Sequence, residues 1–184
     1  MWKKHPKALP FLFFSEMWER FGYYLMIGIF TLYLKDVKAG YAMTEAESAD
    51  LYGTFIALVF LTPFIGGLLA DRYLGYRKSI IIGGLMMGIG YCLMSVHNIA
   101  MLYLSMTLVI VGNGFFKPNI STLLGNVYTT PQYIKQKDDG YNIFYMGINI
   151  GAFICNFFGA ALYIVYGWGA AFLVAGVGLF IGVS

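Results

Sequence analysis

Long apolar stretches constrain this chain more than any other feature of its sequence. Residues 9–34, 51–70, 79–96, 99–124 and 141–166 form five mostly apolar stretches, and residues 168–184 form a sixth that is still apolar at Ser184. A bilayer-crossing helix needs about 20 such residues. Charged residues make up 11% of the chain, against about 25% in a typical soluble domain. The sequence therefore predicts an all-α integral membrane protein with six spans, the last of them cut short.

The positive charges between the stretches predict an orientation. Eight of them fall at the N-terminus and in the second and fourth loops: Lys3, Lys4, Lys7, Arg72, Arg77, Lys78, Lys135 and Lys137. The alternate loops hold only Lys35 and Lys38. Because Lys and Arg accumulate on the cytoplasmic side of a membrane, we expect a cytoplasmic N-terminus. The expected location is the plasma membrane, which is the cell inner membrane in a bacterium.

The spacing of Thr44 and Glu47 predicts where the second helix begins. A threonine followed three residues later by a glutamate is the pattern of a capping box, in which each side chain binds the other residue's backbone N–H group. We therefore expect the second helix to start near Thr44.

The first apolar stretch carries a charged face. On a helix, Glu16, Glu19, Arg20 and Tyr23 fall within about 100° of one another, and Ile27 lies on the same side. Ionisable side chains inside a membrane rarely point at lipid, because exposure to hydrocarbon is costly. This face is therefore predicted to line a protein interior or a water-filled cavity.

Lys117 is the remaining charge within a predicted span. A lysine at the centre of a membrane helix costs at least about 3 kcal/mol on insertion scales. Glu16 and Glu19 together exceed Arg20 by one negative charge, so one carboxylate is available to Lys117. We expect Lys117 to pair with a glutamate in the interior; the alternative is that its side chain extends to a membrane interface.

The fifth stretch has a polar face of its own. Asn142, Tyr145, Asn149 and Asn156 follow helical spacing and share one side. They either face a cavity or hold helices together by hydrogen bonds. Glycines 147, 151 and 159 lie near this face and predict close approach of a neighbouring helix.

Several function classes find little support in the sequence. Cys92 and Cys155 lie in apolar stretches away from other ligands and are expected to be inert, unpaired thiols. We found neither the spacing of a metal site nor a nucleophile–base pair, so we expect no enzyme, no metal and no bound cofactor. Gly112-Asn-Gly114 is interpreted as helix packing. The net charge of +3 does not indicate a nucleic-acid partner.

Four stretches resemble the proton-dependent oligopeptide transporters, a branch of the major facilitator superfamily. Glu16-Met-Trp-Glu19-Arg20-Phe21-Gly-Tyr23-Tyr24 is similar to the family's E-x-x-E-R-F-x-Y-Y motif. Three further matches follow in the family's order: the loop at residues 66–77, Phe116-Lys117-Pro118-Asn119, and the fifth-span stretch at residues 141–153.

The resemblance implies a twelve-span fold of two six-helix bundles, with residues 1–184 as the N-terminal one. It implies alternating access, with protons as the coupling ion and a small peptide as substrate. A proton-coupling network of Glu16, Glu19, Arg20 and Lys117 is implied. The resemblance also implies that Tyr23, Tyr24, Asn149, Lys117 and Arg20 contact the substrate. It implies that Asp71, Arg72 and Arg77 form a cytoplasmic gate. An ordinary positively charged loop is the alternative for the gate.

Two positions depart from the family pattern. Ile27 stands where peptide-transporting members usually carry an arginine, and Phe60 stands where bacterial members often carry a tyrosine. Both changes remove a polar group from the implied site. Arg20 and Lys117 could still bind a carboxylate, so the substrate is expected to be a di- or tripeptide or a related small polar solute.

Two other functions remain open on the sequence alone. A non-transporting six-span membrane subunit could act in docking or assembly. A homodimer of six-span halves is the weaker option, since the family's two halves supply different side chains. We expect the lipid bilayer and a C-terminal bundle of the same protein as partners.

Overall fold

The computed structural model describes residues 2–184, which form helices joined by loops, with no β-strand among them. Six long helices follow one another along the chain. They are α1 (Ala8–Lys35), α2 (Glu45–Leu69), α3 (Tyr76–Met94), α4 (Ile99–Val127), α5 (Lys137–Tyr166) and α6 (Trp168–Val183). Short helical segments accompany them: η1 (Trp2–Lys4), η2 (Ala70–Leu74) and η3 (Ile134–Gln136).

Local sequence signals set the helix ends. The capping box predicted at Thr44 is confirmed: Glu47 donates its backbone N–H to the Thr44 hydroxyl at 3.3 Å, and Thr44 donates its own to the Glu47 carboxylate at 2.8 Å. Gly75 and Gly167 separate consecutive helices with φ angles of 75° and 84°. Glycine adopts positive φ without a Cβ clash, so α2 and α3, and likewise α5 and α6, are joined by very short connections.

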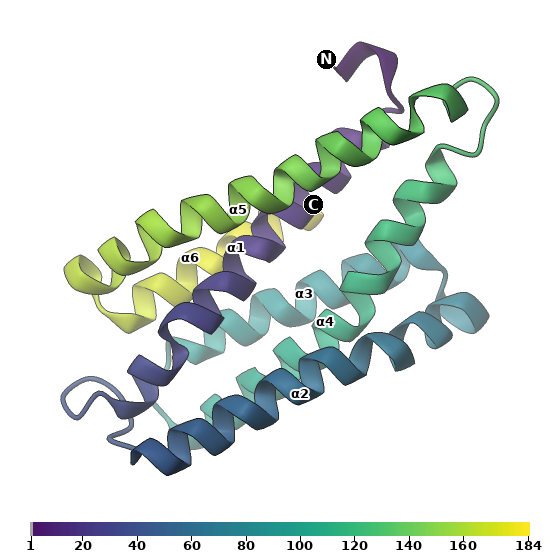
Figure 1. The fold of residues 1–184 in the computed structure, drawn as a ribbon. Coiled ribbons are helices and arrows are strands. Elements are labelled where there is room, and N and C mark those ends of the chain that lie inside the picture. Colours follow the sequence, from purple (N-terminus) through teal and green to yellow (C-terminus); the bar gives the residue numbers. More distant parts are fainter. Residues whose placement is uncertain (1) are drawn as a thin grey trace.

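The helices form two groups of three (Figure 1). In one group α1 packs against α5 and α6, and in the other α4 packs against α2 and α3. The two groups meet mainly where α3 packs on α6. Glycines allow close approach within the second group: a Cβ added to Gly112 would lie 2.6 Å from the Gly83 carbonyl oxygen of α3, and one added to Gly66 of α2 would lie 2.1 Å from the Gly114 carbonyl oxygen. Small residues of this kind are typical of packed membrane helices.

Four helical segments of the described chain are long and apolar enough to cross a membrane. They are Glu45–Leu74, Tyr76–Met94, Ile99–Val127 and Ile134–Tyr166, and Trp168–Val183 is a shorter apolar helix. α1 has a sufficient length of 28 residues but carries the charged motif at its centre. The helix that departs most from an ordinary apolar span is therefore the one that holds the candidate site.

The loops at one end of the bundle are held together by polar and aromatic contacts. Trp168 donates its indole N–H to the Asp36 carboxylate at 2.8 Å, and the Trp168 ring stacks on Tyr163 at 3.6 Å. This indole bond, helped by the backbone N–H groups of Lys38 and Ala39, lowers the pKa of Asp36 below its ordinary value of 3.8. The contact ties the end of α1 to the start of α6.

Candidate functional site

The charged face of α1 is buried, as the sequence predicts. Glu16, Glu19 and Arg20 have exposed fractions of 4%, 0% and 6%. The Arg20 Nε atom lies 3.2 Å from the Glu16 Oε1 atom and also donates a hydrogen bond to Glu19 Oε2. Buried charges are stable only when they are paired and hydrogen-bonded. One arginine therefore bridges two carboxylates, which leaves the trio with a net negative charge.

Lys117 does not form the ion pair that the sequence predicts. Within the part of the chain that the structure describes, no carboxylate lies within 4 Å of its amine. Its Nζ atom lies 5.1 Å from the centre of the Phe60 ring and 5.8 Å from that of Tyr23, both cation–π distances. Arg20, on the same helix as the glutamates, already engages one oxygen of each carboxylate, and the Lys117 amine lies over the two aromatic rings instead. Lys117 remains half-buried beside the cluster.

Asn113 is a member of the site that the sequence analysis missed. Its side-chain amide donates to Glu19 Oε1 at 3.2 Å, and both residues are 0% exposed. The sequence does hold a signal, because Asn113 lies four residues before Lys117 and therefore on the same face of α4. Tyr91 of α3 is a second buried neighbour, and a Cβ added to Gly22 of α1 would lie 2.8 Å from its ring.

The cluster contains buried polar atoms without a hydrogen-bond partner. They are Glu16 Oε2, Arg20 Nη2, Asn113 Oδ1 and the Tyr91 hydroxyl. Native proteins leave few such groups, and those that occur often mark functional positions or water sites.

The residues expected to contact substrate fall into two sets. Tyr23 is 7% exposed and lies beneath Arg20, whose Cζ atom is 4.9 Å from the ring centre. Tyr24, in edge contact with Tyr23 at 5.5 Å, is 37% exposed. Asn149 of α5 is exposed. Tyr24 and Asn149 thus lie at the surface of this chain, whereas Tyr23 is packed within the charged cluster.

The rest of the polar face of α5 is also open. Asn142, Tyr145 and Asn156 are exposed, with Tyr145 at 54%. Gly147 and Gly151 are expected near this face from the sequence but lie on the opposite side of the helix, where they are buried against α1. The polar face is therefore not used to bind the neighbouring helices of this bundle.

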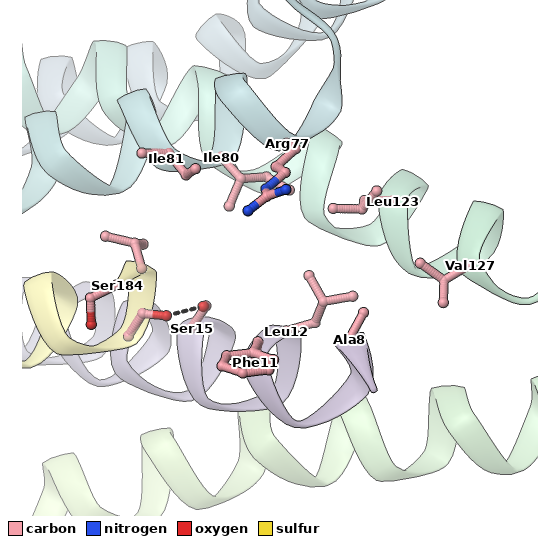
Figure 2. A pocket seen from close by; sticks show the side chains of 12 residues that line it. Ala8, Phe11, Leu12, Ser15, Arg77, Ile80, Ile81, Leu123, Val127 and Ser184 are labelled. Carbon is pink, nitrogen blue, oxygen red and sulfur yellow. Dashed lines mark hydrogen bonds between the residues drawn. The ribbon is translucent and has the colours of Figure 1, made fainter. Parts of the chain in front are cut away.

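The expected gate residues lie at the end of the bundle where η2 meets α3. Asp71, Arg72 and Arg77 are exposed, and none of them is in an ion pair among the described residues. Arg77 points into a pocket of about 510 Å³ between α1, α3, α4 and α6 (Figure 2). On its other wall Ser15 donates to the Gly182 carbonyl.

The two positions that depart from the family pattern have different surroundings. Ile27 is half-buried on α1. Phe60 of α2 is 63% exposed, yet its ring lies under the Lys117 amine. Phenylalanine has no hydroxyl, but its aromatic face still attracts a cation.

The described residues contain no cluster of three His, Cys, Asp or Glu side chains that could hold a metal ion. Cys92 and Cys155 are both free thiols. The carboxylates of the site can exchange protons, and its cations, phenols and amides can bind polar groups.

Comparison with known proteins places these features in a family. The model of the POT family matches residues 77–184. Dipeptide and tripeptide permease A of Escherichia coli K12 is 41% identical over 180 residues, which is 97% of this chain and 35% of that protein. The permease of the same name from Yersinia pestis is 40% identical over 180 residues, again 97% of this chain and 35% of the relative. The chain therefore spans about a third of the length of these relatives.

Solved structures of POT transporters superpose closely on this chain. A peptide transporter POT crystallised with sulfate superposes on the whole chain with a TM-score of 0.93 and 36% identity, and 37% of that transporter is covered. A POT family transporter in complex with 5-aminolevulinic acid gives a TM-score of 0.91 at 30% identity. With the family model matching more than half of its residues, this six-helix chain belongs to the POT family of membrane transporters.

Proposed function

We propose that this chain forms the N-terminal six-span bundle of a proton-coupled symporter that imports short peptides by alternating access. The observation that carries the proposal is the buried cluster of Glu16, Glu19 and Arg20 with Lys117 beside it. Family membership supports it, and the named relatives are permeases rather than enzymes. Those relatives likewise favour a transporter over a non-transporting docking subunit.

The cluster offers a physical route to coupling. When Glu16 or Glu19 takes a proton, Arg20 loses one of its two anionic partners, and the balance of charge around Lys117 changes with it. The energy of a buried ion pair depends strongly on whether water reaches it. Protonation state and exposure to one side of the membrane are therefore linked, which is what a symporter requires.

In the proposed cavity Tyr24 and Asn149 supply hydrogen-bonding groups for the peptide, and Lys117 and Arg20 supply positive charge for its carboxylate. Tyr23 acts through its contact with both cations. Asp71, Arg72 and Arg77 belong to the cytoplasmic gate. The opposing wall comes from a second bundle, the N-terminus is cytoplasmic, and the bilayer is the plasma membrane.

Uptake driven by a pH gradient tests the proposal. The complete transporter is reconstituted in liposomes with radiolabelled dialanine as probe, and Lys117→Ala and Glu19→Gln are compared with the unaltered protein. Both variants should lose proton-driven accumulation while retaining exchange of labelled for unlabelled dialanine across the membrane. Proton-driven accumulation at the unaltered rate in either variant would remove that residue from the coupling network.

A matched control uses a lysine of similar chemistry outside the cluster. Lys35 pairs with Glu45 at 2.9 Å near the surface. Lys35→Ala is expected to leave accumulation unchanged, because exposed ion pairs contribute about 0–1 kcal/mol.

A further inference from the structure

Three consecutive residues of α4 each face a different helix. A Cβ added to Gly112 would lie 2.6 Å from the Gly83 carbonyl oxygen of α3, and one added to Gly114 would lie 2.8 Å from Thr62 of α2. Between them, Asn113 reaches Glu19 of α1. The two glycine contacts bring backbones together and leave α4 little freedom to rotate. The position of the Asn113 amide is fixed by this packing.

The hydrogen bonds of Glu19 differ from those of Glu16. One Glu19 oxygen accepts from Asn113 at 3.2 Å and the other accepts from Arg20, so both oxygens are occupied. Glu16 has one oxygen 3.2 Å from Arg20 and a second oxygen with no partner. Donors aimed at a carboxylate stabilise its ionised form. The two carboxylates of the motif are therefore inequivalent, and Asn113 contributes to the difference.

The Asn113 amide has a partner on its donor side and none on its acceptor side. Its Nδ2 atom binds Glu19, while its Oδ1 atom is buried without a partner. Asn119, on the same helix, instead donates to the backbone carbonyl of Phe115 at 2.7 Å and lies 3.5 Å from that of Gly66. The two asparagines thus serve different partners: one a carboxylate, the other the helix backbone.

We propose that Asn113 is a positioning residue that holds Glu19 ionised and paired with Arg20. This inference rests on the proposed proton-coupled transport for its functional meaning, but its structural content stands on the geometry of α4. Without the amide, Glu19 keeps a single donor in a site closed to water, and its protonation becomes easier.

Other charged and titratable groups surround the same carboxylate. Those around Glu19 are Glu16, Arg20 and Tyr23 of α1, Tyr91 of α3 and Lys117 of α4. Further out, Cys155 of α5 acts on Tyr91 and Tyr52 of α2 acts on Tyr23. None of these changes in the variants below, so a difference among the variants reports on residue 113.

The test compares Asn113→Leu with Asn119→Leu in the complete transporter. Leucine is close to asparagine in shape and has no donor. Dialanine uptake is measured at a series of external pH values. Loss of a hydrogen bond to a charged group corresponds to roughly one pH unit. We expect the pH of half-maximal uptake to rise by about one unit in Asn113→Leu and to stay unchanged in Asn119→Leu.

Infrared difference spectroscopy of the protonated carboxyl band supplies a second readout that needs no transport. At neutral pH, Asn113→Leu should show an additional protonated carboxyl that disappears when Glu19→Gln is added, and Asn119→Leu should not. If Asn113→Leu fails to fold, Asn113→Ala removes the same amide with a smaller side chain, and the extra protonated carboxyl is again expected and should again disappear with Glu19→Gln.

The outcomes separate the two proposals. Identical uptake profiles and identical carboxyl bands in the Asn113 and Asn119 variants would overturn the role of Asn113, even with proton-driven uptake intact. If the unaltered protein shows no proton-driven uptake of dialanine, the proposed function fails in that assay. The infrared comparison still decides whether Asn113 keeps Glu19 ionised.

Discussion

Replacing Gly151 with alanine tests how tightly α5 is packed on the charged motif. A Cβ at this position would lie 2.3 Å from the Met17 carbonyl oxygen and 3.2 Å from the Arg20 Cβ atom. Ordinary contacts between such atoms are about 3.5 Å, so α5 would have to move away from α1 by about 1 Å. The obstacle is a backbone carbonyl within a helix, which cannot turn aside as a flexible side chain could.

The magnitude follows from the cost of overpacking a core. Inserting a methyl group into a well-packed interior typically costs about 1–3 kcal/mol. Alanine also favours a helix over glycine by about 0.5–1 kcal/mol, which offsets part of this cost. We expect Gly151→Ala to lower the free energy of unfolding by about 1–2 kcal/mol, measured by SDS titration of the complete transporter in detergent.

Gly28→Ala is the matched control. Gly28 lies on an exposed part of α1, and a Cβ added there would meet nothing within 4 Å. The same substitution should therefore leave stability unchanged or raise it by about 0.5 kcal/mol. Equal effects at the two positions, or a more stable Gly151→Ala, would refute the close packing of α1 on α5 at the motif.

Two further predictions concern single contacts. Tyr91 has a buried hydroxyl without a partner, and burying such a group costs about 1–3 kcal/mol. Tyr91→Phe should therefore leave the free energy of unfolding unchanged or raise it by about 1 kcal/mol. A decrease of that size would show that the hydroxyl is hydrogen-bonded. The indole of Trp168 lowers the pKa of Asp36 in the folded protein. This contact therefore stabilises the fold at pH values above the ordinary pKa of 3.8, and the stabilisation is lost as the pH falls below that value. The difference in Tm between Trp168→Phe and the unaltered protein should therefore narrow between about pH 7 and pH 3, and a constant difference would contradict the assignment.

Much of the fold follows from patterns that are local along the chain. Apolar stretches predict six helices, and α1 at Ala8–Lys35 runs close to the expected residues 9–34. The capping box at Thr44 depends on residues three apart and is confirmed. The shared face of Glu16, Glu19 and Arg20 follows from helix periodicity, and its burial follows from the cost of charge in lipid. Each of these inferences needs only one helix and its solvent.

What the sequence could not supply depends on how the helices are rotated and how closely they approach. Charge counting assigned Lys117 to a glutamate, but Arg20 reaches both carboxylates first because it lies on their own helix. Asn113 joins the site because glycines on either side of it bring α2 and α3 against α4 and direct its amide toward α1. The sequence alone determined which residues are too polar for lipid. Only the tertiary structure decided which of them meet across helices, because those contacts depend on distances between helices that are not encoded in any one segment.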